Sequence, residues 1–155
     1  MKIIVDSREQ NPFSFERQTD VEVIAGSLAT GDYSLPGLED MVAVERKSLD
    51  DLVGCLAGGG RERFERELSR GRALACFAVV VEAGFGELAG KQYRSRMNPH
   101  AAAQSVIAFQ VRYKTPFIWA GSRLNAEYFT YWTLAKFHKE IMRRYANIFA
   151  IISST

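Results

Sequence analysis

The segment VAVERKSLDDL, residues 42–52, begins as a hydrophobic strand and runs without a turn into three consecutive charged residues, Glu45, Arg46 and Lys47. Side chains on a strand alternate between its two faces, so Glu45 and Lys47 point to one side and Arg46 to the other. The strand end thus carries a carboxylate and an ammonium group side by side. This pattern fits either a strand that emerges into solvent or a polar site at the rim of a sheet.

Further acidic residues stand where neighbouring segments can bring them to the same rim. Asp6 and Glu9 follow an apolar strand expected at residues 2–5. Asp32 follows a glycine that allows the backbone to bend, and Asp50 lies about one turn into the next expected helix. Each of these acids alone is compatible with a solvated surface. Their joint position at strand ends favours a site.

The chemistry of such a cluster points to a bound cation. Four or five carboxylates around one point repel each other strongly unless a positive ion holds them. Oxygen-only ligands suit Mg²⁺ or Mn²⁺ and not zinc. A lysine beside the ion can hold or help to deprotonate a water molecule, while the metal neutralises charge on a phosphoryl oxygen. The cluster therefore predicts metal-assisted hydrolysis of a phosphodiester.

The same residues resemble the hallmark of the XPF-type structure-specific DNA endonuclease family, in which GD is followed by ERKxxxD. Gly31-Asp32, Glu45-Arg46-Lys47 and Asp50 fill every position of that hallmark. Val81-Glu82-Ala83 also falls where the family has a strand that ends in Glu. The similarity extends from residue 2 to about residue 145.

The resemblance implies a restriction-endonuclease-like α/β fold, with a central mixed sheet flanked by helices. It also implies a metal-dependent endonuclease that uses Mg²⁺ or Mn²⁺ to cut flaps, forks or related branched DNA, in repair or recombination. Asp32 and Glu45 would be the principal metal ligands, with the backbone carbonyl of Arg46 as a candidate third, and Lys47 would position the water. The acids that would complete the catalytic site are Asp6, Glu9 and Asp50.

Two regions are candidates for contact with the DNA backbone. Lys91, Arg94 and Arg96 lie in a glycine-flanked segment without an acidic residue, which predicts a DNA-binding loop, with a solvated loop as the alternative. Arg8, beside the first acid, is expected to contact phosphate or to brace the acids, and so is Arg46. The arginines of residues 61–72 suggest a phosphate-binding face, but glutamates alternate with them, which favours a solvated, salt-bridged helix.

The remaining pattern alternates strands and helices, which is typical of an α/β sandwich. We expect a single nuclease domain over residues 1–155, without the helix-hairpin-helix or helicase modules found in other members of the family. The expected strands are residues 2–5, 21–24 (strand or turn), 28–36 (extended after a turn), 41–47, 77–83 and 116–120. The expected helices are residues 48–56, 61–74, 99–112 and 123–145, with a loop at 84–97 and a trailing segment at 148–152.

The overall composition permits nucleic-acid binding without requiring it. The formal net charge is only +2, so any basic surface must come from clustering. Cys55 and Cys76 show no metal-binding spacing and are expected to be reduced thiols of an intracellular protein, cytoplasmic if the source is prokaryotic or viral. The apolar start and the longest apolar run, residues 73–81, are too short for a signal peptide and a membrane span respectively.

The last expected helix is apolar over an arc broader than one core face needs. The residues on this arc are Leu124, Tyr128, Phe129, Tyr131, Trp132, Ala135, Phe137, Ile141, Met142 and Tyr145. Aromatic residues and Met are enriched in protein interfaces, and XPF-type nuclease domains pair through their C-terminal helical region. We therefore expect a twofold homodimer that uses residues 124–145 and the segment 148–152.

Two other functions are compatible with the same fold. The first is a catalytically silent module that binds DNA or serves as a dimer partner. The second is a restriction nuclease. A silent partner is expected to have lost acids of the ERK segment, and this chain retains them all. The ERKxxxD form argues against restriction. The sequence therefore favours an active nuclease, and it leaves open which DNA structure is cut.

Overall fold

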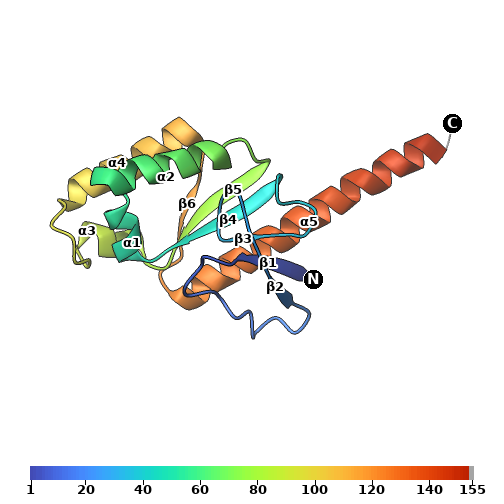
Figure 1. Ribbon diagram of the computed structural model, residues 1–155, viewed down its shortest axis with the longest axis horizontal. Coiled ribbons are helices and arrows are strands. Elements are labelled where there is room, and N and C mark those ends of the chain that lie inside the picture. Colours follow the sequence, from blue (N-terminus) through green and yellow to red (C-terminus); the bar gives the residue numbers. More distant parts are fainter. Residues whose placement is uncertain (154–155) are drawn as a thin grey trace.

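The computed structural model describes residues 1–153, which form a six-stranded sheet with helices on both faces (Figure 1). The strand order is β2-β1-β3-β4-β5-β6. Only β3 runs antiparallel to its neighbours, so the other five strands point the same way. The expected mixed α/β sheet is confirmed. The strands are β1 Lys2–Asp6, β2 Glu22–Gly26, β3 Tyr33–Ser34, β4 Val42–Lys47, β5 Cys76–Val81 and β6 Phe117–Trp119.

This topology brings the carboxyl ends of β1, β4 and β5 to the same end of the sheet, next to the start of β3. Two backbone hydrogen bonds fix the turn that enters β3: Asp6 N donates to Asp32 O at 2.8 Å, and Asp32 N donates to Val44 O at 2.9 Å. Gly31 has a φ of +77°, and a Cβ built on it would lie 2.8 Å from the Cβ of Ala43. Only glycine fits at this position.

The helices form two layers that bury the two faces of the sheet. Their bounds are α1 Leu49–Gly54, α2 Gly58–Gly71, α3 Phe85–Ala89, α4 Pro99–Tyr113 and α5 Arg123–Ser153. One core contains Ala43 and the apolar side chains of α1 to α4. The other contains Val42 and Val44 together with the buried face of α5. The alternation expected for β4 is therefore confirmed, and Glu45 and Lys47 project toward the layer of α1 and α2.

Three expected boundaries were wrong. The segment predicted as a loop at 84–97 contains α3, whose Glu87 accepts a hydrogen bond from Gly84 N at 2.6 Å. Helix α2 starts at Gly58 and not at Arg61, and only glycine fits at position 60, where a Cβ would lie 2.7 Å from Gly54 O. The trailing segment 148–152 is helical and belongs to α5.

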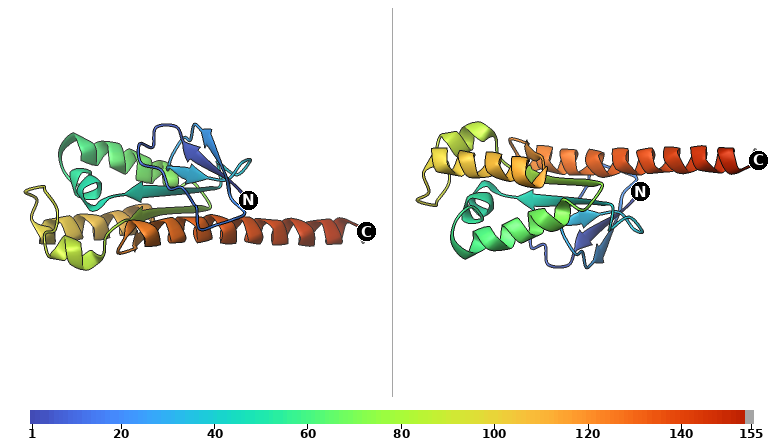
Figure 2. Two further views of the ribbon diagram at one scale, coloured as in Figure 1. Left: turned by 90° about the horizontal axis from the view of Figure 1, so that it is seen from below. Right: turned by 90° about the horizontal axis from the view of Figure 1, so that it is seen from above.

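The distal part of α5 extends well beyond the rest of the molecule (Figures 1 and 2). Ile141 is its last buried residue, and residues 142–153 are all exposed. Within residues 1–153, no helix combines the length and the apolar character needed to cross a bilayer. Cys55 and Cys76 are both free thiols, as expected.

Candidate active site

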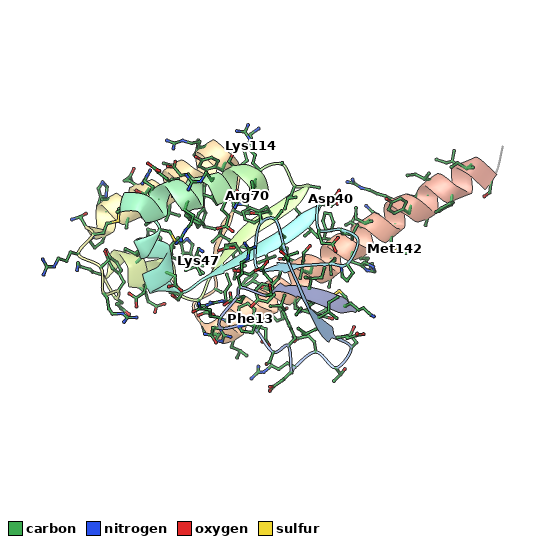
Figure 3. The ribbon with its side chains drawn as sticks, viewed as in Figure 1. Phe13, Asp40, Lys47, Arg70, Lys114 and Met142 are labelled. Carbon is green, nitrogen blue, oxygen red and sulfur yellow. The ribbon has the colours of Figure 1, made fainter. Side chains whose placement is uncertain are left out.

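A pocket of about 230 Å³ lies between the strand ends and α2. Lys47 on β4 lines one side of this pocket and Arg70 on α2 lines the other, and both residues are labelled in Figure 3. Five of the residues singled out from the sequence line this pocket: Asp6, Arg8, Asp32, Glu45 and Lys47. The others do not, namely Glu9, Arg46, Asp50, Lys91, Arg94 and Arg96. The structure therefore divides the predicted residues into a group at the pocket and a group outside it.

Glu45 and Lys47 form an ion pair along one face of β4. Glu45 is only 3% exposed, and burial raises the pKa of its carboxyl, with the nearby carboxylates of Asp32 and Glu67 acting in the same direction. Burial by itself lowers the pKa of Lys47, but the carboxylate of Glu45 more than offsets this and the net shift is upward. Lys47 is therefore positively charged at neutral pH.

Asp32 is the second partly desolvated carboxylate of the pocket. Its Oδ2 accepts a hydrogen bond from the backbone N–H of Arg46 at 2.8 Å. Burial raises the pKa of Asp32 to about 6, and the charge of Glu9 adds to that effect. Two carboxylates whose ionised forms are disfavoured by burial and by each other are suited to hold a cation, which would remove both penalties.

The donor set of the pocket fits Mg²⁺ or Mn²⁺. Within residues 1–153, no three His, Cys, Asp or Glu side chains are grouped closely enough to hold a metal by themselves. Mg²⁺ is usually bound by one or two carboxylates and keeps several of its waters. Asp32 and Glu45 can supply those two carboxylates, whereas Arg46, whose carbonyl was the expected third donor, does not line the pocket.

Asp6 is held by nitrogen donors from two sides. Its Oδ1 accepts from Arg8 Nε at 2.7 Å, and its Oδ2 accepts from Arg8 Nη2 at 2.9 Å and from Leu28 N at 2.7 Å. The hydrogen bonds from Arg8 lower the pKa of Asp6 to about 2. Asp6 is therefore an ionised residue that fixes the loop after β2, and Arg8 braces it while lining the pocket.

Arg46 points to the opposite face of the sheet, where its side chain is 9% exposed. Its guanidinium donates to both carboxylate oxygens of Glu9 at 3.0 Å and to Glu82 at 3.1 Å. Arg123 at the start of α5 also donates to Glu82, at 2.6 Å. The side chain of Arg46 thus bonds two acids on this face, outside the pocket. Glu9 is engaged in this network and does not face the pocket.

Asp50 lies on the exposed side of α1, away from the pocket. It accepts hydrogen bonds from Arg94 N at 2.8 Å and Arg94 Nε at 3.0 Å. The buried side of α1 carries Leu49, Leu52 and Val53, so the helix turns Asp50 toward the loop after α3. That loop also contains Lys91, which donates to Ser95 O, and its Arg94 side chain is 91% exposed.

Helix α2 contributes pocket residues from the segment for which the sequence favoured a solvated, salt-bridged helix over a phosphate-binding face. Arg63, Glu67 and Arg70 line the pocket, and Glu67 Oε1 accepts a weak hydrogen bond from Gly31 N at 3.4 Å. The expected salt-bridged helix is present only in part, as the pairs Arg61–Glu65 and Arg66–Glu62. Positions 63, 67 and 70 run beside the buried positions 64, 68 and 71, but the alternation of Arg and Glu does not show this in the sequence.

The model of the ERCC4 domain matches residues 5–131. This chain belongs to the ERCC4 domain family. The match spans β1 through the first part of α5 and includes every pocket residue. The resemblance of the GD and ERKxxxD segments to XPF-type nucleases is therefore confirmed at the level of the family.

The solved structures similar to this ERCC4 domain agree with that assignment. XPF from Aeropyrum pernix matches with a TM-score of 0.69 and 22% identity, over 94% of this chain and 70% of that one. XPF from Aeropyrum pernix in complex with DNA matches with a TM-score of 0.67 and 22% identity, over 90% of this chain and 65% of that one. At this identity the likeness establishes the fold. No curated protein matches the sequence.

Proposed function

We propose that this ERCC4 domain is a metal-dependent endodeoxyribonuclease that hydrolyses phosphodiester bonds in branched DNA, such as flaps or forks. The observation that carries the proposal is the Glu45–Lys47 ion pair, which shares one pocket with the partly buried carboxylate of Asp32. A pocket with buried acids and one lysine at a sheet edge has the charges needed for phosphodiester hydrolysis. The similarity to an XPF–DNA complex supports DNA as the substrate.

The roles of the residues follow from their positions. Asp32 and Glu45 would hold Mg²⁺ or Mn²⁺, which when bound lowers the pKa of water and neutralises phosphoryl charge. Lys47 is charged and fixed by Glu45, so it acts as a hydrogen-bond donor that orients a water molecule or a phosphate oxygen. Asp6 holds the pocket loop through Leu28, and Arg46 keeps β1, β4 and β5 in register through Glu9 and Glu82.

A catalytically silent DNA-binding module on the same fold is the alternative. The geometry favours the enzyme, because a module that only binds DNA gains nothing from a buried and a partly buried acid whose charges oppose phosphate. Both Asp32 and Glu45 are held at the floor of the pocket at a cost in desolvation. Such a cost is typical of a site that carries out chemistry.

We propose further that two copies of the chain pair through α5. The side of α5 that is buried against the sheet carries Tyr131, Leu134 and Ile141. Beyond the rest of the molecule, the same side of the helix continues with Tyr145 and Ile148, at spacings of four and three residues, and these five residues form one apolar seam. A seam with this spacing matches a second helix of the same kind. A single projecting helix with exposed apolar side chains is stabilised when it is covered, and a second copy offers an identical surface.

The test of the proposed function is a cleavage assay on labelled flap, fork, nicked and Holliday-junction DNA, with linear duplex and single strands as references. Mg²⁺ or Mn²⁺ should produce incision of at least one branched form, and EDTA should abolish it. Tight binding of branched DNA without incision under any of these conditions would identify the silent module instead.

A further inference from the structure

The arginines of α2 fall into two groups that differ in their partners. Arg61 pairs with Glu65 at 3.6 Å, and Arg66 pairs with Glu62 at 4.0 Å. In the part of the chain that the structure describes, Arg63 and Arg70 form no ion pair with any carboxylate, although the helix carries three glutamates. Both of these side chains line the pocket that holds Asp32 and Glu45.

The helix geometry explains this division. Phe64, Leu68 and Gly71 form the buried stripe of α2, so the adjacent stripe of positions 63, 67 and 70 faces the pocket. Arg66 lies off that stripe and is exposed. The pocket wall formed by α2 therefore presents Arg63, Glu67 and Arg70 in that order.

The two arginines are set apart along the helix. A rise of 1.5 Å per residue separates positions 63 and 70 by about 10 Å along the helix axis. Phosphates on one DNA strand advance by about 3.4 Å per nucleotide along the duplex axis, so this offset allows the two arginines to reach different phosphates of one strand. Glu67 lies between them and repels a phosphate that has no cation beside it.

We propose that Arg63 and Arg70 bind backbone phosphates on the two sides of the phosphodiester that is cut, so that the cut strand lies against α2. This inference rests on the proposed nuclease function and assigns the strand-binding wall of that same pocket. The phosphate between the two arginines faces Glu67, Asp32 and Glu45, which is the position where negative charge requires a metal ion.

The side chains are suited to this role. Guanidinium groups bind phosphate oxygens through two parallel hydrogen bonds. Arg70 Nε donates to Ala29 O at 3.1 Å, which fixes the direction of the side chain and leaves its terminal nitrogens for a ligand. Arg8, on the loop after β1, lines the pocket as well and adds a third positive charge.

The test compares Arg63→Ala and Arg70→Ala with Arg66→Ala, a change of the same type on the same helix outside the pocket. The probe is a fluorescein-labelled flap DNA, and its binding is measured by anisotropy over a range of salt concentrations. Each pocket variant should weaken binding about tenfold and lower the slope of log K against log salt by about one. Arg66→Ala should stay within about twofold of wild type, and all three should melt at the wild-type temperature.

A second arm replaces a phosphate next to the cut bond with an uncharged methylphosphonate. If an arginine contacts that phosphate, the substitution weakens binding to wild type but has little further effect on the matching variant. Pocket variants that bind like Arg66→Ala, while wild type cuts the flap, would overturn this inference alone. A wild-type protein that shows the arginine dependence but never cuts DNA would overturn the nuclease proposal and leave the phosphate contacts standing.

Discussion

The ammonium group of Lys47 pairs with the carboxylate of Glu45, two residues earlier on β4, and both side chains line the same pocket. The pairing follows from the alternation of a strand, which puts positions 45 and 47 on one face and position 46 on the other. The carboxylate keeps Lys47 charged in a buried place. One strand end therefore supplies both a metal-binding acid and a fixed hydrogen-bond donor.

Neutralising Asp32 should stabilise the metal-free protein. Its pKa is raised to about 6 by burial, so the folded state favours the protonated carboxyl. The stability this contributes is fully present below about pH 4 and is lost as the pH rises through about 6. The free energy of unfolding of Asp32→Asn should therefore exceed that of wild type by about 1–3 kcal/mol at pH 7, and the difference should vanish near pH 4.

Urea unfolding in EDTA at several pH values measures this difference, with the exposed Asp40→Asn as the control. Added Mg²⁺ should raise the stability of wild type and not that of Asp32→Asn, because only wild type keeps the ligand. Equal stability of wild type and Asp32→Asn at pH 7 would show that burial does not raise the pKa of Asp32.

Arg46→Met should destabilise the fold more than any surface ion-pair change. The substitution keeps the aliphatic length but leaves Glu9 without a cationic partner in a buried place. Removing one member of a buried ion pair costs about 3–5 kcal/mol. Arg143→Met breaks the exposed Arg143–Glu140 pair and should cost less than about 0.5 kcal/mol. Urea unfolding measures the loss of stability in both variants. Similar losses in Arg46→Met and Arg143→Met would rule out a bracing role for Arg46.

The loop after α3 is expected to contact DNA outside the pocket. Neutralising Lys91, Arg94 and Arg96 together should weaken binding to all sequences and lower the salt slope by about one per lost phosphate contact. Asp50→Asn is informative beside it, because it frees Arg94 without removing positive charge and should not weaken binding. A triple variant with the wild-type slope would mean that this loop does not touch DNA.

Pairing through α5 should make the protein a dimer at micromolar concentration in analytical ultracentrifugation. Tyr145→Glu and Ile148→Glu place a charge on the exposed distal part of the seam, so both should shift the mass toward the monomer. Val111→Glu is the matched control, since Val111 is apolar and 76% exposed but lies on α4, outside the proposed interface. A wild-type protein that stays monomeric over this range would exclude the dimer.

The sequence was sufficient for those parts of the fold and site that depend on local pattern. The apolar run before Glu45 and the glycine before Asp32 each fix a backbone position, and Ser48 is of a residue type that caps helix starts. In the structure Ser48 Oγ accepts from Asp51 N at 3.1 Å, as a capping residue does. Family resemblance then placed these segments in one sheet, which periodicity alone does not determine.

The features that could not be predicted from the sequence depend on tertiary contacts. Glycines at 84 and 86 have low helix propensity, yet a capping interaction and packing beside α4 form α3 around them. Asp50 follows the hallmark spacing, but the rotation of α1 turns it to Arg94. The pocket side of α2 became identifiable only when Phe64 and Leu68 were seen to be buried, because alternating Arg and Glu look alike on every face.

The most direct test of the central claim is the single-turnover rate of flap-DNA incision by wild type, Glu45→Gln and Lys47→Ala at saturating Mg²⁺. Glu62→Gln, on the outer side of α2, is the control. We predict that wild type and the control incise the DNA at similar rates. The incision rate of the two pocket variants should fall by about a thousandfold or more, because they lose interactions made in the transition state. Their affinity for DNA should stay within a few fold of wild type. Incision by Glu45→Gln at a rate within about tenfold of wild type would contradict the assignment of this pocket as the active site.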